Sequence, residues 1–244
     1  MPPNKHKTPP NLTLYSAQTL SPLNCLAFVL PLLVFFHIGA AVYGSTLLAP
    51  RYVYGVLKFF GATSWYLPGL LIVTVLLIQH AAGGWPWKVH GLALAGMAGE
   101  SVLWTLPLVA LSYLTGHFTL NAAAGGNGLV PVLDAVGAGV YEEFTFRLVL
   151  LSLAMLIFVD VAGLKKDVVV IFFIFAGAIA FSLCHFTFLE LSGHAHFNWS
   201  KFAFLAAAGV LWGIIYVYRG FAIAVGSHIA WDLFVVFIHT RTAV

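Results

Sequence analysis

The chain has 244 residues, of which 61% are hydrophobic and 8% are charged. Soluble domains carry about 25% charged residues, so this composition excludes a soluble globular protein and indicates an integral membrane protein. The formal net charge of +3 is small and scattered over several loops, which excludes a nucleic-acid-binding surface. Apolar segments of about 20 residues recur along nearly the whole chain, so we expect one membrane-embedded helical bundle and no separate soluble domain.

The first twenty residues are rich in Pro, Lys, Asn and Thr, and we expect them to form a disordered head. Residues 21–244 are expected to form a single all-α domain, a polytopic bundle of about seven transmembrane helices. The aromatic, weakly basic segment Arg51–Trp65 could lie in the membrane interface or form part of an eighth element. The seven expected spans are Leu23–Leu48, Leu67–Ala82, Gly91–Thr115, Val130–Val159, Val168–Glu190, Phe202–Tyr218 and Phe221–His239.

The basic residues of the connections predict the orientation of these spans. With the amino terminus inside, the inner side carries Lys5, Lys7, Lys88, Lys165, Lys166 and Arg219. The outer side then carries Arg51, Lys58, Lys201 and Arg241. Because basic residues favour the cytoplasmic side, this excess predicts a cell-membrane protein with a cytoplasmic amino terminus.

Three charged residues, Glu142, Glu143 and Arg147, fall inside the expected span Val130–Val159. Each ionised side chain near a bilayer centre costs on the order of 2.5–3.5 kcal/mol, so all three must face protein or water. Glu143 and Arg147 are four residues apart and share a helix face, where they can neutralise each other. Glu142 is left without a local counter-charge. The structural alternative is an ion pair beside a hydrogen-bonded carboxylate.

Three further ionisable residues, His185, His228 and Asp232, lie in later spans. His185 is expected late in Val168–Glu190, a position typical of a simple interfacial histidine. His228 and Asp232 share a helix face, where a carboxylate can orient an imidazole or both groups can bind one ion. At 1.5 Å per residue, Glu142 lies about 18 Å and His185 about 8 Å from the outer ends of their spans, and His228 about 10 Å from the inner end. The three meet only if helices tilt or boundaries shift.

Glu100 is expected in the middle of the third span, where an ionisable residue is costly. It could be a partner of the other polar residues or part of a proton relay. Equally, it could be a protonated acid that is hydrogen-bonded to a neighbour.

Three short motifs resemble those of the CAAX protease and bacteriocin-processing (CPBP, or Abi) family. Glu142-Glu143-Phe-Thr-Phe-Arg147 is similar to the family's EExxxR motif, Phe181-Ser-Leu-Cys-His185 to FxxxH, and His228-Ile-Ala-Trp-Asp232 to HxxxN/D. The resemblance covers about residues 130–235 and implies a membrane-embedded peptidase domain. It gives Glu143 and Arg147 the role of fixing their helix.

The same resemblance assigns catalytic roles to Glu142, His185, His228 and Asp232. Glu142 would act as a general base on a water, which His185 would help to hold. His228 and Asp232 would bind a metal or stabilise the oxyanion. A zinc ion could be held by all four side chains, although no self-sufficient zinc motif is present, and a metal-free mechanism is the alternative. Because some family members carry Asn where this chain has Asp232, its carboxylate fits a metal ligand or a histidine orienter better than an oxyanion donor.

The resemblance implies an intramembrane endopeptidase that acts on a membrane-associated protein or peptide within the lipid bilayer. The scissile bond would lie near the carboxyl terminus or in a membrane-proximal segment, as in CAAX-type or sorting-tag and bacteriocin-type processing. One alternative is a non-catalytic membrane immunity or scaffold protein. The other is an ion-coupled transporter, but its inverted repeat and paired broken helices are not visible in the sequence.

Overall fold

The computed structural model describes residues 14–43, 66–115 and 128–242, and the regular structure in these segments is helical. Two stretches, η1 and η2, are π-helices within a longer helical segment. The elements are α1 (Leu14–Thr19), α2 (Pro22–Tyr43), α4 (Leu67–Ala82), α5 (Gly91–Leu103), α6 (Leu106–Thr115), α7 (Val130–Glu143), η1 (Phe144–Val149), α8 (Leu150–Ala154), η2 (Met155–Val161), α9 (Lys166–Leu183), α10 (Phe188–Leu191), α11 (Trp199–Arg219) and α12 (Phe221–Thr242).

Within these described residues, six helical segments are long and apolar enough to cross a membrane. They are Pro22–Tyr43, Gly91–Leu114, Val130–Val161, Lys166–Leu183, Trp199–Arg219 and Phe221–Ile238. The helix α4 is apolar but shorter. The predicted polytopic all-α bundle is therefore confirmed, whereas the segment predicted as an eighth element, Arg51–Trp65, lies outside the described residues.

One predicted boundary near the amino terminus of the chain is wrong, since residues 14–19, which were expected in the disordered head, form α1. The expected span Gly91–Thr115 has the bounds of the segment formed by α5 and α6, but this segment is interrupted at Trp104 and Thr105, two residues before Pro107. Proline lacks the N–H group that a continuous helix needs, so an interruption at this point has a local cause.

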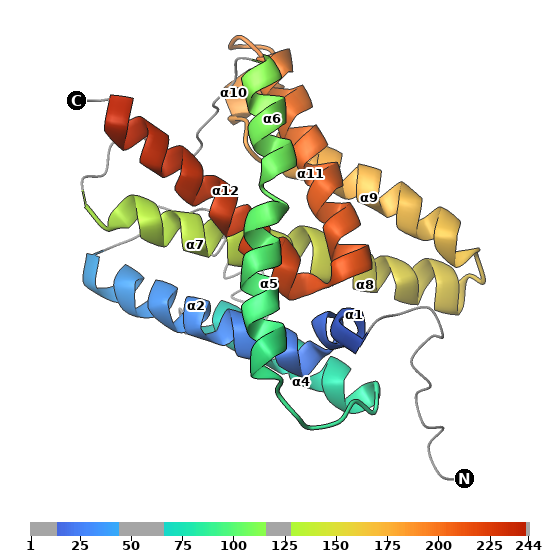
Figure 1. Ribbon diagram of the computed structural model, residues 1–244. Helices are drawn as coiled ribbons and strands as arrows, with labels where there is room; N and C mark the ends of the chain where they lie inside the picture. Colours follow the sequence, from blue (N-terminus) through green and yellow to red (C-terminus); the bar gives the residue numbers. More distant parts are fainter. Residues whose placement is uncertain (1–13, 44–65, 116–127, 243–244) are drawn as a thin grey trace.

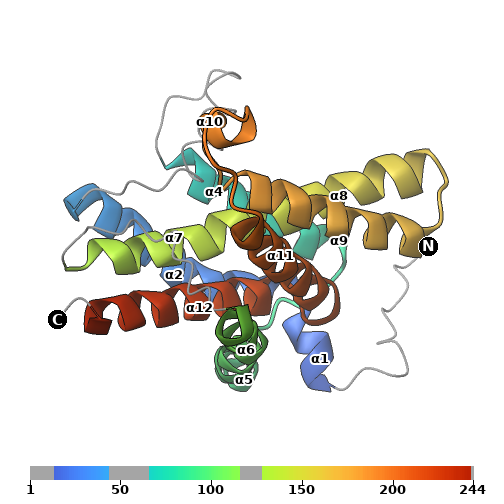
Figure 2. The same cartoon turned by 90° about the horizontal axis from the view of Figure 1, so that it is seen from above.

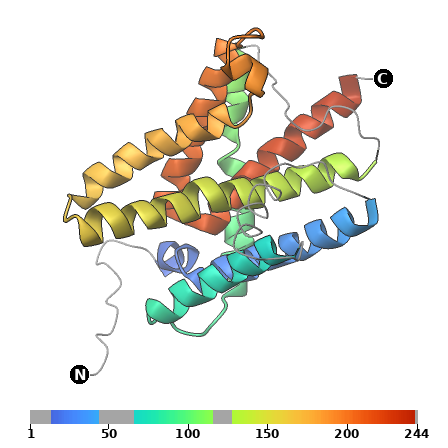
Figure 3. The ribbon, with the colours of Figure 1, turned by 180° about the vertical axis from the view of Figure 1, so that it is seen from behind.

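The helices cross one another steeply rather than forming a parallel bundle. In Figure 1, α5 and α6 run nearly perpendicular to α2 and α7 and cross α12 obliquely. In Figure 2, which is turned by 90°, α5 and α6 are seen almost end-on while α7 and α12 are seen from the side. Figure 3 shows the segment from α7 to α8 between α2 with α4 on one side and α9 with α11 on the other. This crossing brings the end of α7 and the middle of α12 together with the end of α9.

Glycines allow the closest of these approaches. A Cβ atom on Gly139 of α7 would lie only 3.0 Å from the backbone nitrogen of Ile229 in α12. A Cβ atom on Gly209 of α11 would lie 2.9 Å from the Cα atom of Ala178 in α9. Small residues let membrane helices pack backbone to backbone, so these two contacts determine how α7 meets α12 and how α9 meets α11.

The first motif lies where the helix changes its winding. The segment Val130–Val161 is continuous, but it passes from α-helix to π-helix directly after Glu143. The hydroxyl of Thr145 donates to the carbonyl of Tyr141, 2.8 Å away, at this change. Short π segments within α-helices occur frequently at functional sites.

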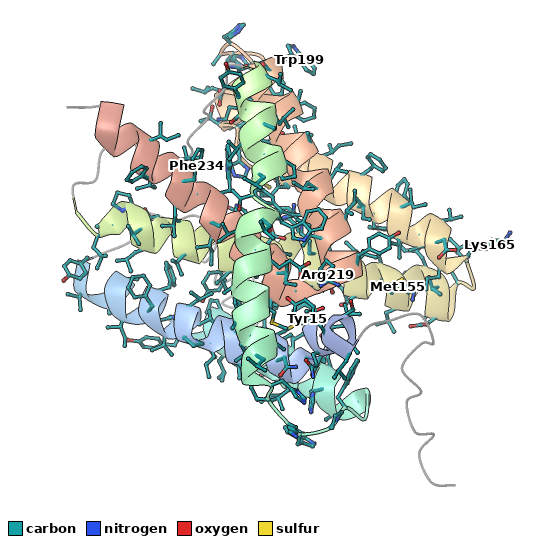
Figure 4. All side chains as sticks on the ribbon, in the orientation of Figure 1. Tyr15, Met155, Lys165, Trp199, Arg219 and Phe234 are labelled. Atoms are coloured by element: carbon teal, nitrogen blue, oxygen red, sulfur yellow. The ribbon has the colours of Figure 1, made fainter. Side chains whose placement is uncertain are left out.

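A second polar cluster joins the amino-terminal helix to the bundle, away from the motifs. Arg219 forms a two-pronged ion pair with Glu100, with an Nη2–Oε2 distance of 2.7 Å. Tyr15 and Trp104 also donate to the Glu100 carboxylate, and Figure 4 labels Tyr15 and Arg219 beside each other. Burial, followed by the neighbouring Glu100 carboxylate, raises the pKa of Tyr15 to about 12. Glu100 thus anchors α1 as the carboxylate of an ion pair, which neither sequence-based alternative described.

Candidate active site

Glu142, His185 and His228 meet in space although they come from three separate segments. The Oε2 atom of Glu142 lies 3.7 Å from Nε2 of His185 and 3.8 Å from Nε2 of His228. The side chains of Glu142 and His185 are each 14% exposed, so the cluster is neither fully buried nor open. The mismatch of depths calculated from the predicted spans does not occur, because the helices cross obliquely and α9 ends early.

The position of His185 differs from the sequence-based expectation. The residue was expected inside the span Val168–Glu190, but α9 ends at Leu183 and His185 lies in the turn that follows. Its Nδ1–H donates to the carbonyl of Phe181, 2.7 Å away, and its ring lies 4.6 Å from the Phe181 ring. With the proton on Nδ1, the neutral imidazole presents an unprotonated Nε2 to Glu142.

His228 is held on three sides. Its Nδ1–H donates to Oε1 of Glu143 at 2.8 Å. The ring of Trp212 stacks on the imidazole with a centroid distance of 3.8 Å and an interplanar angle of 13°. The remaining nitrogen, Nε2, faces Glu142 and also lies 3.6 Å from Oδ2 of Asp232. The orientation of His228 is therefore fixed before any ligand arrives.

Glu143 connects the imidazole of His228 to the guanidinium of Arg147. Its Oε1 atom lies 3.0 Å from Nη1 of Arg147, which confirms that the two residues share a face. Arg147 also donates to the carbonyl of Gly209, 3.1 Å away, and its guanidinium lies 4.8 Å from the ring centroid of Phe181. Because Glu143 and Arg147 are 0% and 2% exposed, this buried pair ties the first motif to both other motif segments.

Asp232 does not have the orienting role that the sequence favoured. The carboxylate that binds Nδ1 of His228 is Glu143, whereas Asp232 lies near Nε2 at more than hydrogen-bond distance. Its side chain is 22% exposed, the highest value among these clustered groups. Asp232 therefore lies at the open side of the cluster, beside the nitrogen that faces Glu142.

The predicted zinc set was Glu142, His185, His228 and Asp232. Zinc binds nitrogen and oxygen ligands at about 2.0–2.2 Å, so its ligands must converge closely. Within the described part of the chain, no group of three or more His, Cys, Asp or Glu side chains converges in this way. The residues as placed do not fit a zinc ion, and the zinc site stays a prediction from the resemblance.

Sequence reasoning missed the residues that hold the turn carrying His185. The Nζ atom of Lys201 donates to the carbonyl of His185 at 2.9 Å and lies 4.7 Å from the ring centroid of Phe186. Phe186 in turn stacks on Phe197, with ring centroids 4.4 Å apart. In the sequence, Lys201 lies among aromatic residues between two expected spans, which is typical of an anchor in the membrane interface. Its position after the second motif was the signal that could have suggested a role near His185.

The short helix α10 closes the same turn with a reciprocal cap. Thr187 accepts from the backbone N–H of Glu190, and the Glu190 carboxylate accepts from the backbone N–H and the hydroxyl of Thr187. These two donors, the backbone N–H first, lower the pKa of Glu190. Such a capping box satisfies donors that would otherwise be unpaired at a helix start, so α10 is a separate helix and not a continuation of α9.

Comparison with known proteins agrees with the three motifs. A family model described as "Type II CAAX prenyl endopeptidase Rce1-like" matches residues 125–234, a little under half of the chain. The matched range contains Glu142, Glu143, Arg147, His185, His228 and Asp232. No curated protein and no solved structure matches the chain. Residues 125–234, which carry the motifs, therefore match a family of CAAX proteases, and this match supports intramembrane protease activity in general.

Proposed function

We propose that the protein is an intramembrane endopeptidase in which Glu142 acts as the general base on a water. The observation that carries this proposal is the state of the Glu142 Oε2 atom. It is buried, has no hydrogen-bond partner among the described residues, and faces the Nε2 atoms of His185 and His228. A water that lies between these three atoms has one acceptor to take its proton and two imidazoles to hold it in place.

The proposed reaction needs only the residues of the cluster. Glu142 takes a proton from the water as the water oxygen attacks the peptide carbonyl, and His185 holds the water through Nε2. The carbonyl oxygen then becomes an oxyanion, which His228 stabilises when its Nε2 carries a proton. Glu143 holds the ring through Nδ1 throughout. When the carbon–nitrogen bond breaks, Glu142 returns the proton to the leaving amine.

The exposure of the cluster favours an enzyme over a scaffold. A scaffold would keep its carboxylates away from solvent and bonded, as Glu143 is 0% exposed and contacts both Arg147 and His228 through Oε1. The Oε2 atom of Glu142 has no hydrogen-bond partner among the described residues, while the side chains of Glu142 and Asp232 are 14% and 22% exposed. An unpaired acid that retains access from outside is suited to chemistry more than to packing.

We propose as substrate a membrane-associated protein that is cut near its carboxyl terminus or in a membrane-proximal segment. The matching family is described by its action on prenylated CAAX proteins, which supports the first position. The test uses purified protein in phosphatidylcholine vesicles with two substrates, a farnesylated CAAX peptide and an unprenylated membrane-spanning sorting-tag peptide. Mass spectrometry should find a cut in one of them. Folded protein that cuts neither would support the scaffold.

Replacement of Asp232 separates the metal-free mechanism from a zinc mechanism. Asn supplies a permanent hydrogen-bond donor beside His228, where an ionised Asp supplies none. We therefore expect Asp232→Asn to be at least as active as the wild type near neutral pH, with a strong chelator present. The metal-free mechanism would be contradicted if a chelator inhibited the enzyme and Asp232→Asn lowered its activity by about 10- to 100-fold in a way that added zinc reversed. Changes at metal ligands have effects of that size.

Replacement of Lys201 tests the positioning of His185. Lys201→Met keeps the aliphatic chain but removes the donor to the His185 carbonyl, so the imidazole should shift away from Glu142. A misplacement on the order of 1 Å can lower a rate by about 100-fold, so we expect a loss of 10- to 100-fold in kcat with little change in KM. Lys201→Arg should restore most of the rate, and Lys165→Met in an exposed turn is the control. Full activity of Lys201→Met would show that the turn holds its place without this contact.

A further inference from the structure

A cavity separate from the catalytic cluster opens between the amino-terminal helices and the end of the α8–α9 hairpin. Its volume is about 460 Å³, and residues of α2, α4, η1, α8, η2, α9, α11 and α12 line it. None of its lining residues belongs to the catalytic cluster. Small-molecule sites typically measure about 300–1,000 Å³, so the cavity is large enough for a ligand.

The inner part of the cavity is apolar. Cys25, Leu148 and Leu151 line it, and each is at most 5% exposed. The hydroxyl groups of Ser152 and Tyr216 also line it. A water needs two to four polar partners, so this inner part is a poor site for water and a good one for hydrocarbon.

The mouth of the cavity is charged with both signs. Asp160 at the end of η2 and Lys166 at the start of α9 line it, and both are exposed. With a helical rise of about 1.5 Å or slightly less per residue, Leu148 and Asp160 are about 15–18 Å apart along the helix. The cavity therefore reaches from the charged helix ends into the bundle. Met155, which lies between them along the chain and lines the cavity, is labelled in Figure 4. Charged helix ends of membrane-spanning segments lie at the level of lipid head groups.

We propose that this cavity binds one phospholipid with an amine-bearing, zwitterionic head group. One acyl chain would fill the apolar part along η2. Lys166 would pair with the phosphate and Asp160 with the ammonium group, which matches the two charges of the mouth. The lipid would join the motif-bearing segment to α2 and α4. The proposal rests on the membrane-spanning character of the chain and not on the proposed peptidase activity.

Native mass spectrometry of the detergent-purified protein tests the site. We expect one retained phospholipid per chain, and after delipidation a preference for phosphatidylethanolamine over phosphatidylglycerol. Met155→Trp fills the cavity and should reduce lipid occupancy at least about tenfold. The control is Leu153→Trp, which places the same ring on the opposite side of the segment. Leu153 is 49% exposed, so this variant should retain the lipid. Equal occupancy in the two variants would mean adventitious annular lipid and would overturn the proposal.

Two charge variants test the head group and do not require a buried substitution. Lys166→Gln should lower the affinity for every phospholipid tested, and Asp160→Asn should abolish the preference for phosphatidylethanolamine. Their controls are Lys165→Gln and Asp167→Asn, exposed neighbours that do not line the cavity. If Lys166→Gln and Lys165→Gln bind these lipids alike, the assigned head-group site is wrong, whatever the peptidase assay shows.

Discussion

Glu142→Gln is expected to abolish peptide cleavage while the protein remains folded. Gln keeps the size of the side chain and a hydrogen-bonding oxygen but cannot accept the proton of the attacking water. General base catalysis contributes about 10²–10⁴-fold, so the rate should fall by at least two orders of magnitude. The measurement is cleavage of the membrane-anchored substrate by equal amounts of purified variant and wild type.

The folding control for this variant is the thermal transition in detergent. Since Glu142 Oε2 has no hydrogen-bond partner among the described residues, the amide should change the melting temperature little. Asp167→Asn, at an exposed position in the first turn of α9, controls for loss of a carboxylate and should retain full activity. A Glu142→Gln variant that cuts at the wild-type rate would remove Glu142 from the mechanism, and one that does not fold would make its role structural.

Glu143 and Arg147 are expected to be strongly coupled in stability. Removal of one partner of a buried ion pair typically costs about 3–5 kcal/mol, because the other charge is left unpaired. Glu143→Leu and Arg147→Met should each cost roughly this much, while the double variant should cost clearly less than the sum. The measurement is a double-mutant cycle on the free energy of unfolding.

The ion pair of Glu100 and Arg219 provides a matched comparison. It also joins a glutamate to an arginine, here through two contacts between separate helices, but its side chains are 18% and 19% exposed, so solvent weakens the consequence of breaking it. The same cycle on this pair should give the smaller coupling energy. Additive losses at Glu143 and Arg147 would mean that the two side chains do not act together in the membrane protein.

The helix content and the motif residues were predictable from sequence, whereas some helix ends were not. The bounds of α4, Leu67–Ala82, coincide with the predicted span because turn residues flank an apolar run. The end of α9 was missed because hydropathy continues through Phe186 and Phe188. A local signal was present, since Thr187-Phe-Leu-Glu190 has the pattern of a capping box.

The pairing within the site depended on information that spacing does not contain. Sequence spacing placed Glu143 beside Arg147 correctly, since both lie on one helix. It suggested Asp232 as the partner of His228 for the same reason, whereas the bond to Nδ1 comes from Glu143 on another helix. Contacts between helices depend on crossing angles, and here these follow from glycine contacts such as Gly139 against α12.

In the proposed mechanism, Glu142 activates a water and does not itself attack the peptide bond. A single-turnover cleavage in water enriched in oxygen-18, followed by mass spectrometry of the new carboxyl group and of the peptide that contains Glu142, tests it directly. We expect one oxygen-18 atom in the new carboxyl group and none in Glu142. An unlabelled product with oxygen-18 in the Glu142 carboxylate would show that Glu142 attacks the peptide carbonyl itself, and it would contradict the proposed mechanism.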